Sequence, residues 1–426
     1  MIFRFTAYLL APIYLAALLW RGRREAGYWR GFGQRFGLAP ALPAPVWLHA
    51  ASVGEVQAAA ILVAALRERD AQLPLLVTAT TAAGLARART LFAASGVAVR
   101  YAPLDLPGAV RRFLTRVQPR LAIVLETEIW PNLFAACGAR HVPLVLASAR
   151  LSERSARRYR WLGSALRNAL AAVVQVAAQT PADAQRFADL GVPPARITVT
   201  GNLKADLAVP DSVLANGQRL RAQLAPQRPM WVAGSTHEIE EQQVLNAQRA
   251  VSEVVAQALL VLVPRHPARF TAVAEWLRRE QVPFVRYSRG EPVTAETTVL
   301  LVDAMGLLLD FYAAGDVAFV GGSLVPIGGH NLLEPAALGR PILTGPSHAN
   351  ARDVLEALLA AQGVRVVREG SELAQAVTQL LGDPEDCQRM GARALQVVVD
   401  GRGACARVLA LLPAFEPTAG PAAARP

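Results

Sequence analysis

Short apolar runs alternate with longer amphipathic stretches along most of the chain, and this alternation limits the possible fold more than any other feature. Brief apolar runs separated by helical patterns are typical of strands that are joined through helices. Strands connected in this way pair in parallel and are covered by helices on both faces, so the sequence predicts an α/β, doubly wound fold. The expected strands are 46–50, 75–80, 121–125, 143–147, 173–178 and 197–199, followed by 230–233, 259–263, 284–286, 299–302, 317–320, 341–343 and 364–367.

The chain has 426 residues, too many for one ordinary core, and the strand pattern restarts after an interruption. The interruption, 206–229, is polar and contains prolines, so we interpret it as a linker between domains 23–205 and 230–412. The end of the chain, 413–426, is rich in proline and alanine and is predicted to be disordered. Two Rossmann-like domains facing each other would direct the carboxyl ends of their strands into a central cleft, the usual ligand position in open α/β sheets.

The N-terminal segment 1–22 is a candidate for attachment to a membrane. Its apolar stretch from Phe5 to Trp20 is short of the roughly 20 residues that cross a bilayer as a helix. Arginines follow the stretch instead of preceding it, which argues against a secretory signal. Three interpretations stay open: a short or tilted membrane anchor, a helix lying in the membrane interface, and a buried helix of a soluble protein. We favour attachment to a membrane with the rest of the chain in the cytoplasm.

The overall charge limits the class of partner. The formal net charge is +11, which favours nucleic acid, anionic lipid or a phosphorylated substrate. The three cysteines, Cys137, Cys387 and Cys405, are scattered, as expected in a reducing compartment without disulfides or a zinc site. The chain has no Walker loop, no Gly-x-Gly-x-x-Gly fingerprint and no Asp-x-Asp pair. We therefore expect a transferase that uses neither a metal nor a cofactor.

Carboxylates follow two of the expected strands in the N-terminal half. Ser52 can cap the helix that begins near Glu55, and Gly54 keeps the turn open. Partial burial there would raise the pKa of Glu55 and make it a general base. An ordinary first-turn glutamate, stabilised by the helix dipole, is an equally good interpretation. Glu126 and Glu128 come directly after an apolar strand, so they are expected either to bind a ligand or to serve as caps and ion-pair partners.

Lys204 is the only lysine of the chain, and every other basic residue apart from histidine is an arginine. A compact ammonium at this single position, just after an expected strand, suggests a functional role. Chance placement is the alternative.

The segment Gly321–Pro335 is the strongest indication of a ligand site in the C-terminal half. Paired glycines follow an apolar strand and precede an expected helix at 331–338, which suits a nucleotide-sugar pocket with Glu334 toward the ribose. Arg265, after another strand, has the planar guanidinium that grips a phosphate. His237 and His266 are individually weak signals. A glycine-rich surface loop is the alternative.

Taken together, these motifs make the chain resemble the 3-deoxy-D-manno-oct-2-ulosonic acid (Kdo) transferases of lipopolysaccharide synthesis, from the N-terminus to about Leu381. The motifs that carry the resemblance are Ser52–Glu55, Glu126–Leu133, Ala147–Ser152, Pro264–Pro267, Gly321–Gly322 and Gly328–Asn331. The resemblance implies a GT-B glycosyltransferase at the cytoplasmic face of the inner membrane. It also implies the reaction: Kdo passes from CMP-Kdo to a lipid A precursor (lipid IVA), with inversion. The expected partners are then that donor, that acceptor and an anionic membrane surface, and no nucleic acid.

Roles for individual residues are also implied by this resemblance. Glu55 corresponds to the proton acceptor, and Glu126 and Lys204 correspond to residues that support the transition state. The positions that correspond to the CMP-Kdo-binding segments are Pro264, Arg265, Met305, Gly306, Leu307, Gly328, Gly329, His330, Asn331, Leu332, Leu333 and Glu334. Leu307 replaces the usual glutamate, and Asp310, one helical turn further on, is the candidate to substitute for it. A GT-B-fold nucleotide-sugar epimerase and a non-catalytic, membrane-attached nucleotide- or lipid-binding protein are the rival functions.

Overall fold

A computed structural model describes residues 31–42, 44–126, 128–206, 209–348 and 351–413, together with residues 8, 11, 12, 16, 18–20, 22, 23 and 26–29. Much of the predicted anchor at 1–22, Thr127 and nearly all of the predicted tail at 413–426 lie outside these residues. Within the described part of the chain, no helix combines the length and the apolar character that crossing a membrane requires.

The chain forms two compact units, Met1–Asp206 with Arg402–Pro426, and Leu207–Gly401. Their boundaries differ from the predicted domains in two places. The predicted linker contains α9 (Asp211–Leu224), which packs on α12 (Leu308–Ala314) within the second unit. Gly217 permits this close packing, since a Cβ there would lie 2.5 Å from that of Ala313.

The second difference is α17 (Ala404–Leu411), which belongs to the first unit and not to the preceding domain. Val408 and Leu409 of this helix join the first unit's core, where they contact neighbours of α2 (Val53–Arg69). The Asp206 carboxylate also accepts the backbone N–H groups of Gly403 and Cys405. The chain therefore returns to its first unit after completing the second.

The first unit is built on a sheet of seven parallel strands in the order β3-β2-β1-β4-β5-β6-β7. The strands are β1 (Val46–His49), β2 (Leu75–Ala79), β3 (Ala98–Tyr101), β4 (Leu121–Leu125), β5 (Leu144–Ala149), β6 (Val173–Ala178) and β7 (Ile197–Val199). Apart from α2 and α17, the helices are α3 (Ala82–Leu91), α4 (Pro107–Val117), α5 (Pro131–Gly138), α6 (Glu153–Arg160), α7 (Ser164–Ala171) and α8 (Pro181–Asp189). Only β3 was not expected, because it is an edge strand with an arginine in its short sequence.

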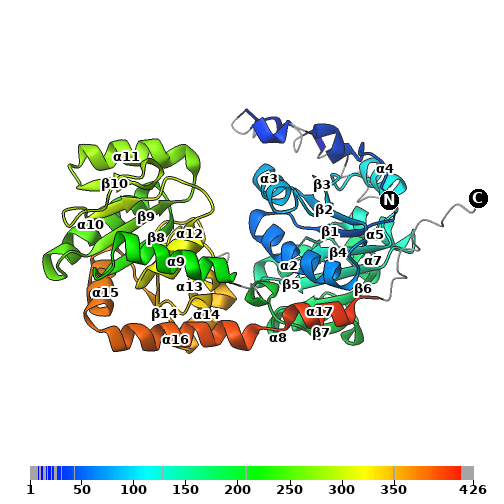
Figure 1. Ribbon diagram of the computed structural model, residues 1–426. Helices are drawn as coiled ribbons and strands as arrows, with labels where there is room; N and C mark the ends of the chain where they lie inside the picture. The colour runs from blue at the N-terminus through cyan, green and yellow to red at the C-terminus, as the bar shows by residue number, and fades with distance from the viewer. Residues whose placement is uncertain are drawn as a thin grey trace, which may run out of the picture. The chain divides into compact units, whose positions relative to one another are not determined.

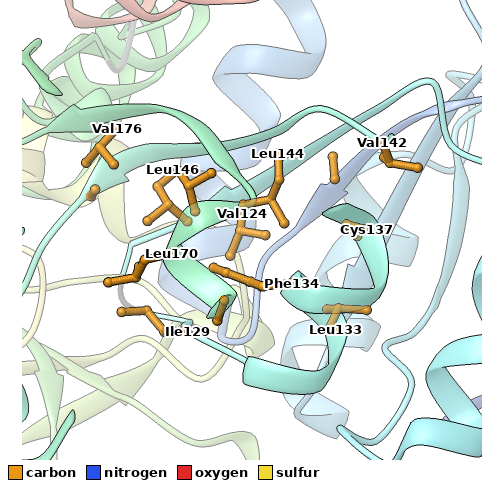
Figure 2. Packing of buried hydrophobic residues seen from close by; sticks show 14 of the residues in the cluster. Val124, Ile129, Leu133, Phe134, Cys137, Val142, Leu144, Leu146, Leu170 and Val176 are labelled. Carbon is orange, nitrogen blue, oxygen red and sulfur yellow. The ribbon is translucent and has the colours of Figure 1, made fainter. Parts of the chain in front are cut away.

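Alternate strand residues supply two cores on opposite faces of this sheet. On one face, strand side chains pack with those of α4, α5, α7 and α8; Figure 2 shows Val124, Leu144 and Leu146 gathered with Phe134 and Leu170. On the other face, strand side chains pack with α2 and α17. Burial on both faces explains why the strands read as continuous apolar runs.

The second unit has its own sheet of seven parallel strands, in the order β10-β11-β9-β8-β12-β13-β14. Figure 1 labels β8, β9, β10 and β14 of this sheet. The strands are β8 (Met230–Thr236), β9 (Leu259–Pro264), β10 (Phe284–Arg286), β11 (Val299–Leu301), β12 (Val317–Val320), β13 (Ile342–Thr344) and β14 (Val364–Val366). Besides α9 and α12, the helices are α10 (Glu238–Val254), α11 (Phe270–Arg279), α13 (Leu333–Ala337), α14 (Arg352–Ala360), α15 (Gly370–Gly382) and α16 (Pro384–Gly401). One face packs on α10, α11 and α15, and the other on α9, α12, α13, α14 and α16.

Two doubly wound parallel sheets confirm the predicted fold class. Each sheet also has a point where the strand order reverses, between β1 and β4 in the first unit and between β8 and β12 in the second. Loops separate on either side of such a point, and ligands of open α/β sheets bind outside the carboxyl ends of the strands there. Polar side chains at these two places are therefore the candidates for function.

Candidate active site

Glu55 is fixed at the start of α2, directly after β1. Ser52 caps this helix: its hydroxyl oxygen accepts the Glu55 N–H at 3.4 Å, and its hydroxyl donates to Glu55 Oε1 at 2.9 Å. The Ala51 N–H donates to the other carboxyl oxygen, Glu55 Oε2, at 2.8 Å. The predicted cap is thus confirmed, and the whole Glu55 residue is only 8% exposed.

The environment of Glu55 favours its protonated form. Burial raises the pKa of this carboxyl from 4.5 to about 8, and the negative charges of Glu126 and Glu128 add to the shift. The hydrogen bonds from Ala51 and Ser52 lower the pKa but do not cancel these effects. A carboxylate with such a pKa is a much stronger base than an exposed glutamate, and this is the property that general-base catalysis near neutral pH requires.

Glu126 and Lys204 form an ion pair close to the start of α2. Lys204 Nζ lies 2.6 Å from Glu126 Oε1, and both side chains are largely buried. A Cβ on Gly54 would lie 3.5 Å from Lys204 Nζ, which places the ammonium against the first turn of the helix that carries Glu55. Glu126 follows β4 with a left-handed backbone (φ 56°), which a non-glycine residue rarely adopts. Strained backbone of this kind is concentrated at functional sites.

The Lys204 loop is held by the Ala147–Ser152 motif. The Leu203 N–H donates to Ser148 Oγ at 3.3 Å, and the Lys204 N–H donates to Asn202 Oδ1 at 2.9 Å. Ser148 is itself held by Gln179, whose amide donates to its backbone carbonyl and to its hydroxyl. The motif therefore positions Lys204, a role that its sequence alone did not indicate.

Glu128 is held differently from the other two carboxylates. The Trp130 indole donates to Glu128 Oε2 at 2.7 Å, and His49 Nε2 lies 3.8 Å from the same oxygen. Burial alone would raise the pKa of Glu128, but the nearby His49 and the indole outweigh it, so the pKa is lowered. His49 is oriented in turn by Thr78, whose hydroxyl lies 2.9 Å from Nδ1. The three neighbouring carboxyls thus differ: the pKa of Glu128 is lowered, Glu126 forms an ion pair with Lys204, and the pKa of Glu55 is raised.

In the second unit, the buried carboxylate of Glu240 holds the glycine-rich segment. Its oxygens accept four backbone N–H groups, from Gly322 at 2.7 Å, Leu324 at 2.9 Å, Ser323 at 3.1 Å and His237 at 3.3 Å. Glu240 lies in the first turn of α10, after β8, whereas Gly322, Ser323 and Leu324 follow β12. This contact joins the two loops on either side of the point where the strand order reverses.

We expect Glu240→Gln to lower the free energy of unfolding by roughly 1–3 kcal/mol, the cost of leaving a buried donor without an acceptor. The new amide group has N–H bonds of its own and cannot accept the N–H groups that faced the replaced oxygen. Denaturant unfolding at neutral pH measures the change. Glu238→Gln, in the same helical turn but with a side chain 79% exposed, is the matched control. Equal stability of the two variants would contradict this role for Glu240.

His237, His266 and His330 gather with Arg265 at the same end of the second sheet. His237 Nε2 lies 2.9 Å from His330 Nε2, and the His237 and His266 rings meet edge to face at 5.4 Å between centroids. Gly322 makes room for His330, because its φ is 67° and a Cβ there would lie 2.8 Å from the ring. Two histidines that were weak signals in the sequence thus join His330 of the predicted donor segment.

The other predicted donor-binding residues lie around this cluster on the same unit. Gly328 and Gly329 have left-handed backbones, and the Gly328 N–H donates to Ser347 Oγ. Leu332 and Leu333 are buried in the core, whereas Asn331 and Glu334 are half-buried. The helix that was expected at 331–338 is shorter, because the Asn331 carboxamide accepts the Leu333 N–H in a turn before the helix begins.

The remaining predicted donor-binding residues lie at the end of β9 and just before α12. Pro264 ends β9, and Met305 and Gly306 are exposed before α12. Leu307 is half-buried and packs against the apolar core of the unit. The Asp310 carboxylate accepts a hydrogen bond from the Asn216 amide of α9 at 3.2 Å.

Sequence comparison places the chain among known proteins. Residues 30–207 match the family model described as 3-deoxy-D-manno-octulosonic-acid transferase (kdotransferase). The chain is 42% identical over 371 residues to the 3-deoxy-D-manno-octulosonic acid transferase of Haemophilus influenzae, with 87% of each chain covered. It is 40% identical to the Bordetella pertussis transferase of the same name, covering 94% of this chain and 97% of the relative.

Solved structures with low sequence identity share the fold alone. The UDP-GlcNAc 2-epimerase from Neisseria meningitidis matches with a TM-score of 0.59 at 13% identity, over 86% of this chain and 99% of that one. Both units are thus α/β domains with parallel sheets that resemble those of GT-B glycosyltransferases. At this identity the likeness does not make the chain an epimerase, whereas the match to the transferases extends over nearly all of its length. The chain therefore belongs to the 3-deoxy-D-manno-octulosonic acid transferase family.

Proposed function

We propose that this Kdo transferase moves Kdo from CMP-Kdo to a lipid A precursor, lipid IVA, with inversion and without a metal ion. The observation that carries the proposal is the buried Glu55 carboxyl, whose pKa is raised to about 8 beside Glu126 and Glu128. Transfer to an alcohol needs a group that removes the hydroxyl proton as the new bond forms. Glu55 meets this need, and membership of the Kdo transferase family indicates that the transferred sugar is Kdo.

In the proposed reaction, Glu55 takes the proton of a primary hydroxyl on the glucosamine disaccharide of the acceptor. The hydroxyl oxygen attacks the anomeric carbon of Kdo and forms the new C–O bond. The bond from that carbon to the CMP phosphate breaks, and its electron pair leaves with the phosphate. A single displacement of this kind inverts the anomeric centre.

Lys204 and Glu126 are proposed to support the transition state. Lys204 is the compact cation nearest to the start of α2, and its ion pair with Glu126 fixes the position of its ammonium. A fixed charge needs no reorganisation when charge develops on the reacting atoms, which is the main source of electrostatic catalysis. Burial is the main cause of the raised pKa of Glu55, and the negative charge of Glu126 adds to it.

The second unit is proposed to bind the donor. Arg265 and the histidines beside it face the phosphate, and Glu334 and Asn331 face the ribose and base. Pro264, the Met305–Leu307 turn and the segment Gly328–Leu333 complete the donor-binding surface. The charge of Arg265 and the hydrogen-bond donors beside it would stabilise the departing phosphate with protein groups alone.

We also propose that the enzyme is attached to the inner membrane at its cytoplasmic face, where it meets the lipid acceptor. A net charge of +11 favours an anionic surface, and the apolar stretch at 5–20 supplies a second attachment signal. Helix α6 adds exposed arginines, and the exposed Trp161 follows it directly.

Incubation with freshly generated CMP-Kdo and lipid IVA, followed by mass spectrometry of the lipid, tests the proposal. A gain of one or more Kdo masses on the lipid supports it. Release of CMP without a change in the lipid would point to hydrolysis, and a rearranged nucleotide sugar would point to an epimerase. An unchanged donor and an unchanged lipid would favour a non-catalytic binding protein.

A further inference from the structure

Three of the six histidines of the chain meet at one end of the second sheet. His237 follows β8, His266 follows the neighbouring strand β9, and His330 lies beyond β12 on the other side. The order β9-β8-β12 brings these loops together, although the sequence separates His237 from His330 by 93 positions. Arg265 adjoins His266 in the chain, and it contributes a positive charge that acts on both His237 and His330.

The short contact between His237 and His330 has a defined proton count. With 2.9 Å between the two Nε2 atoms, one nitrogen donates a proton and the other accepts it. In a neutral pair, one of the two Nδ1 atoms then carries a hydrogen and the other has a lone pair. The His237 side chain accepts the Glu240 N–H at the start of α10, so in the neutral pair the lone pair lies on His237 Nδ1. One added proton replaces this cap contact with an N–H donor, and both Nδ1 atoms are then donors. The pair can therefore change from a mixed donor and acceptor into a double donor by taking up a single proton.

Burial and the charges around the pair disfavour that added proton. Burial lowers the pKa of His330 to about 3, with Arg265, His237 and His266 adding to the effect. Burial also lowers the pKa of His237, together with His266, Arg265 and Arg269. The acidic groups in the first turn of α10 are already engaged, since Glu238 and Glu241 pair with Arg269 and Glu240 accepts backbone N–H groups. A bound anion would reverse this balance because it favours the protonated imidazole.

We propose that the His237–His330 pair takes up one proton when a phosphate monoester binds beside Arg265, and that both imidazoles then donate to the phosphate. This assigns His237 to the donor site, in addition to His330, and it rests on the proposed binding of CMP-Kdo by the second unit. The pair then donates hydrogen bonds to the departing CMP, whose phosphate gains a negative charge when its bond to Kdo breaks. The proton enters from solvent and supplies a second donor where charge develops.

Calorimetric titration of the full chain with CMP at pH 7.5 tests the proposal. The observed enthalpy is measured in several buffers of different ionisation enthalpy, and its slope gives the number of protons taken up. We expect close to one proton for each CMP bound, and none for cytidine, which lacks the phosphate. His237→Asn, whose side chain is a good helix N-cap, should abolish the uptake and weaken CMP binding about ten- to a hundredfold.

Two further variants complete the experiment. His330→Asn should also abolish the uptake, which keeps the test decisive if one of the two variants fails to fold. His141→Asn alters an exposed histidine of the first unit and should leave uptake and affinity unchanged. Tight CMP binding without proton uptake, or an uptake that survives both pair variants, would overturn this inference and leave the proposed function standing. Absence of CMP binding would overturn both.

Discussion

Replacing Glu55 by glutamine is expected to lower kcat for Kdo transfer about 10²–10⁴-fold while CMP affinity stays unchanged. Glutamine retains the shape of the side chain and can accept the N–H of Ala51, but it cannot remove a proton. CMP affinity should not change, because the proposed donor site lies on the other unit. Turnover is measured as Kdo added to the lipid, and CMP affinity by calorimetry.

Glu153→Gln is the matched control for this variant. Glu153 also follows a serine cap, Ser152, in the first turn of a helix that comes after a strand, but it is exposed. The control should transfer Kdo at the wild-type rate. Turnover of Glu55→Gln within tenfold of the wild type would show that another group removes the proton.

Glu55→Gln should also make the protein more stable than the wild type in alkaline solution. Because folding raises the pKa of Glu55 from 4.5 to about 8, the fold favours the protonated carboxyl. Its contribution to stability is complete below pH 4.5 and is lost as pH rises through 8. Glutamine stays neutral throughout, so the variant should gain stability over the wild type between pH 5 and pH 9. This opposite change in activity and stability is typical of a catalytic group.

Replacing Lys204 by methionine is expected to lower kcat at neutral pH by about 10²–10³-fold, the usual effect of removing one charge-stabilising group. The variant leaves the largely buried Glu126 carboxylate without its partner at 2.6 Å. Because the charge of Glu126 already raises the pKa of Glu55, loss of the ammonium should raise it further. The rise of activity with pH should therefore move to higher pH, as kinetics from pH 6 to pH 10 would show.

A double variant separates the two effects of Lys204. Lys204→Met with Glu126→Gln removes both charges, so the pH dependence should return toward that of the wild type. Activity should stay low, because the ammonium that supports the transition state is still missing. Lys204→Arg retains the positive charge and should keep a larger share of activity than methionine. Full recovery in the double variant would mean that Lys204 only neutralises Glu126.

The sequence was sufficient for most of the sheet framework. Strands such as Leu121–Leu125 are buried on both faces, so their apolar runs stand out without any partner being known. The edge strand Ala98–Tyr101 lacks such a run, and α17 carries no local sign that its Val408 belongs to the first core. Sequence patterns report what a segment buries, but they do not report which core buries it.

The candidate site was predictable where chemistry is local and was missed where it is not. Glu55 and its Ser52 cap are three residues apart and were recognised together. Glu240 looks like any first-turn glutamate, because the loop that it holds lies 82 positions away at Gly322. The contact of His237 with His330 has the same origin. Such pairs arise from the strand order, which no short motif encodes.

Position 307 illustrates a further limit of prediction by resemblance. Leu307 packs into the apolar core, and Asp310 accepts a hydrogen bond from Asn216 that ties α12 to α9. That Asp310 substitutes for the missing carboxylate at the donor stays a prediction. Its contact with Asn216 gives this side chain a structural role as well.

The central claim is that Glu55 removes the acceptor proton, and the pH dependence of kcat/KM for Kdo transfer tests it most directly. The free enzyme's base governs this quantity, so it should rise tenfold for each unit of pH at low pH and level off near pH 8, the raised pKa of Glu55. A profile that is flat from pH 6 to pH 9, or that levels off near pH 4.5, would contradict the account.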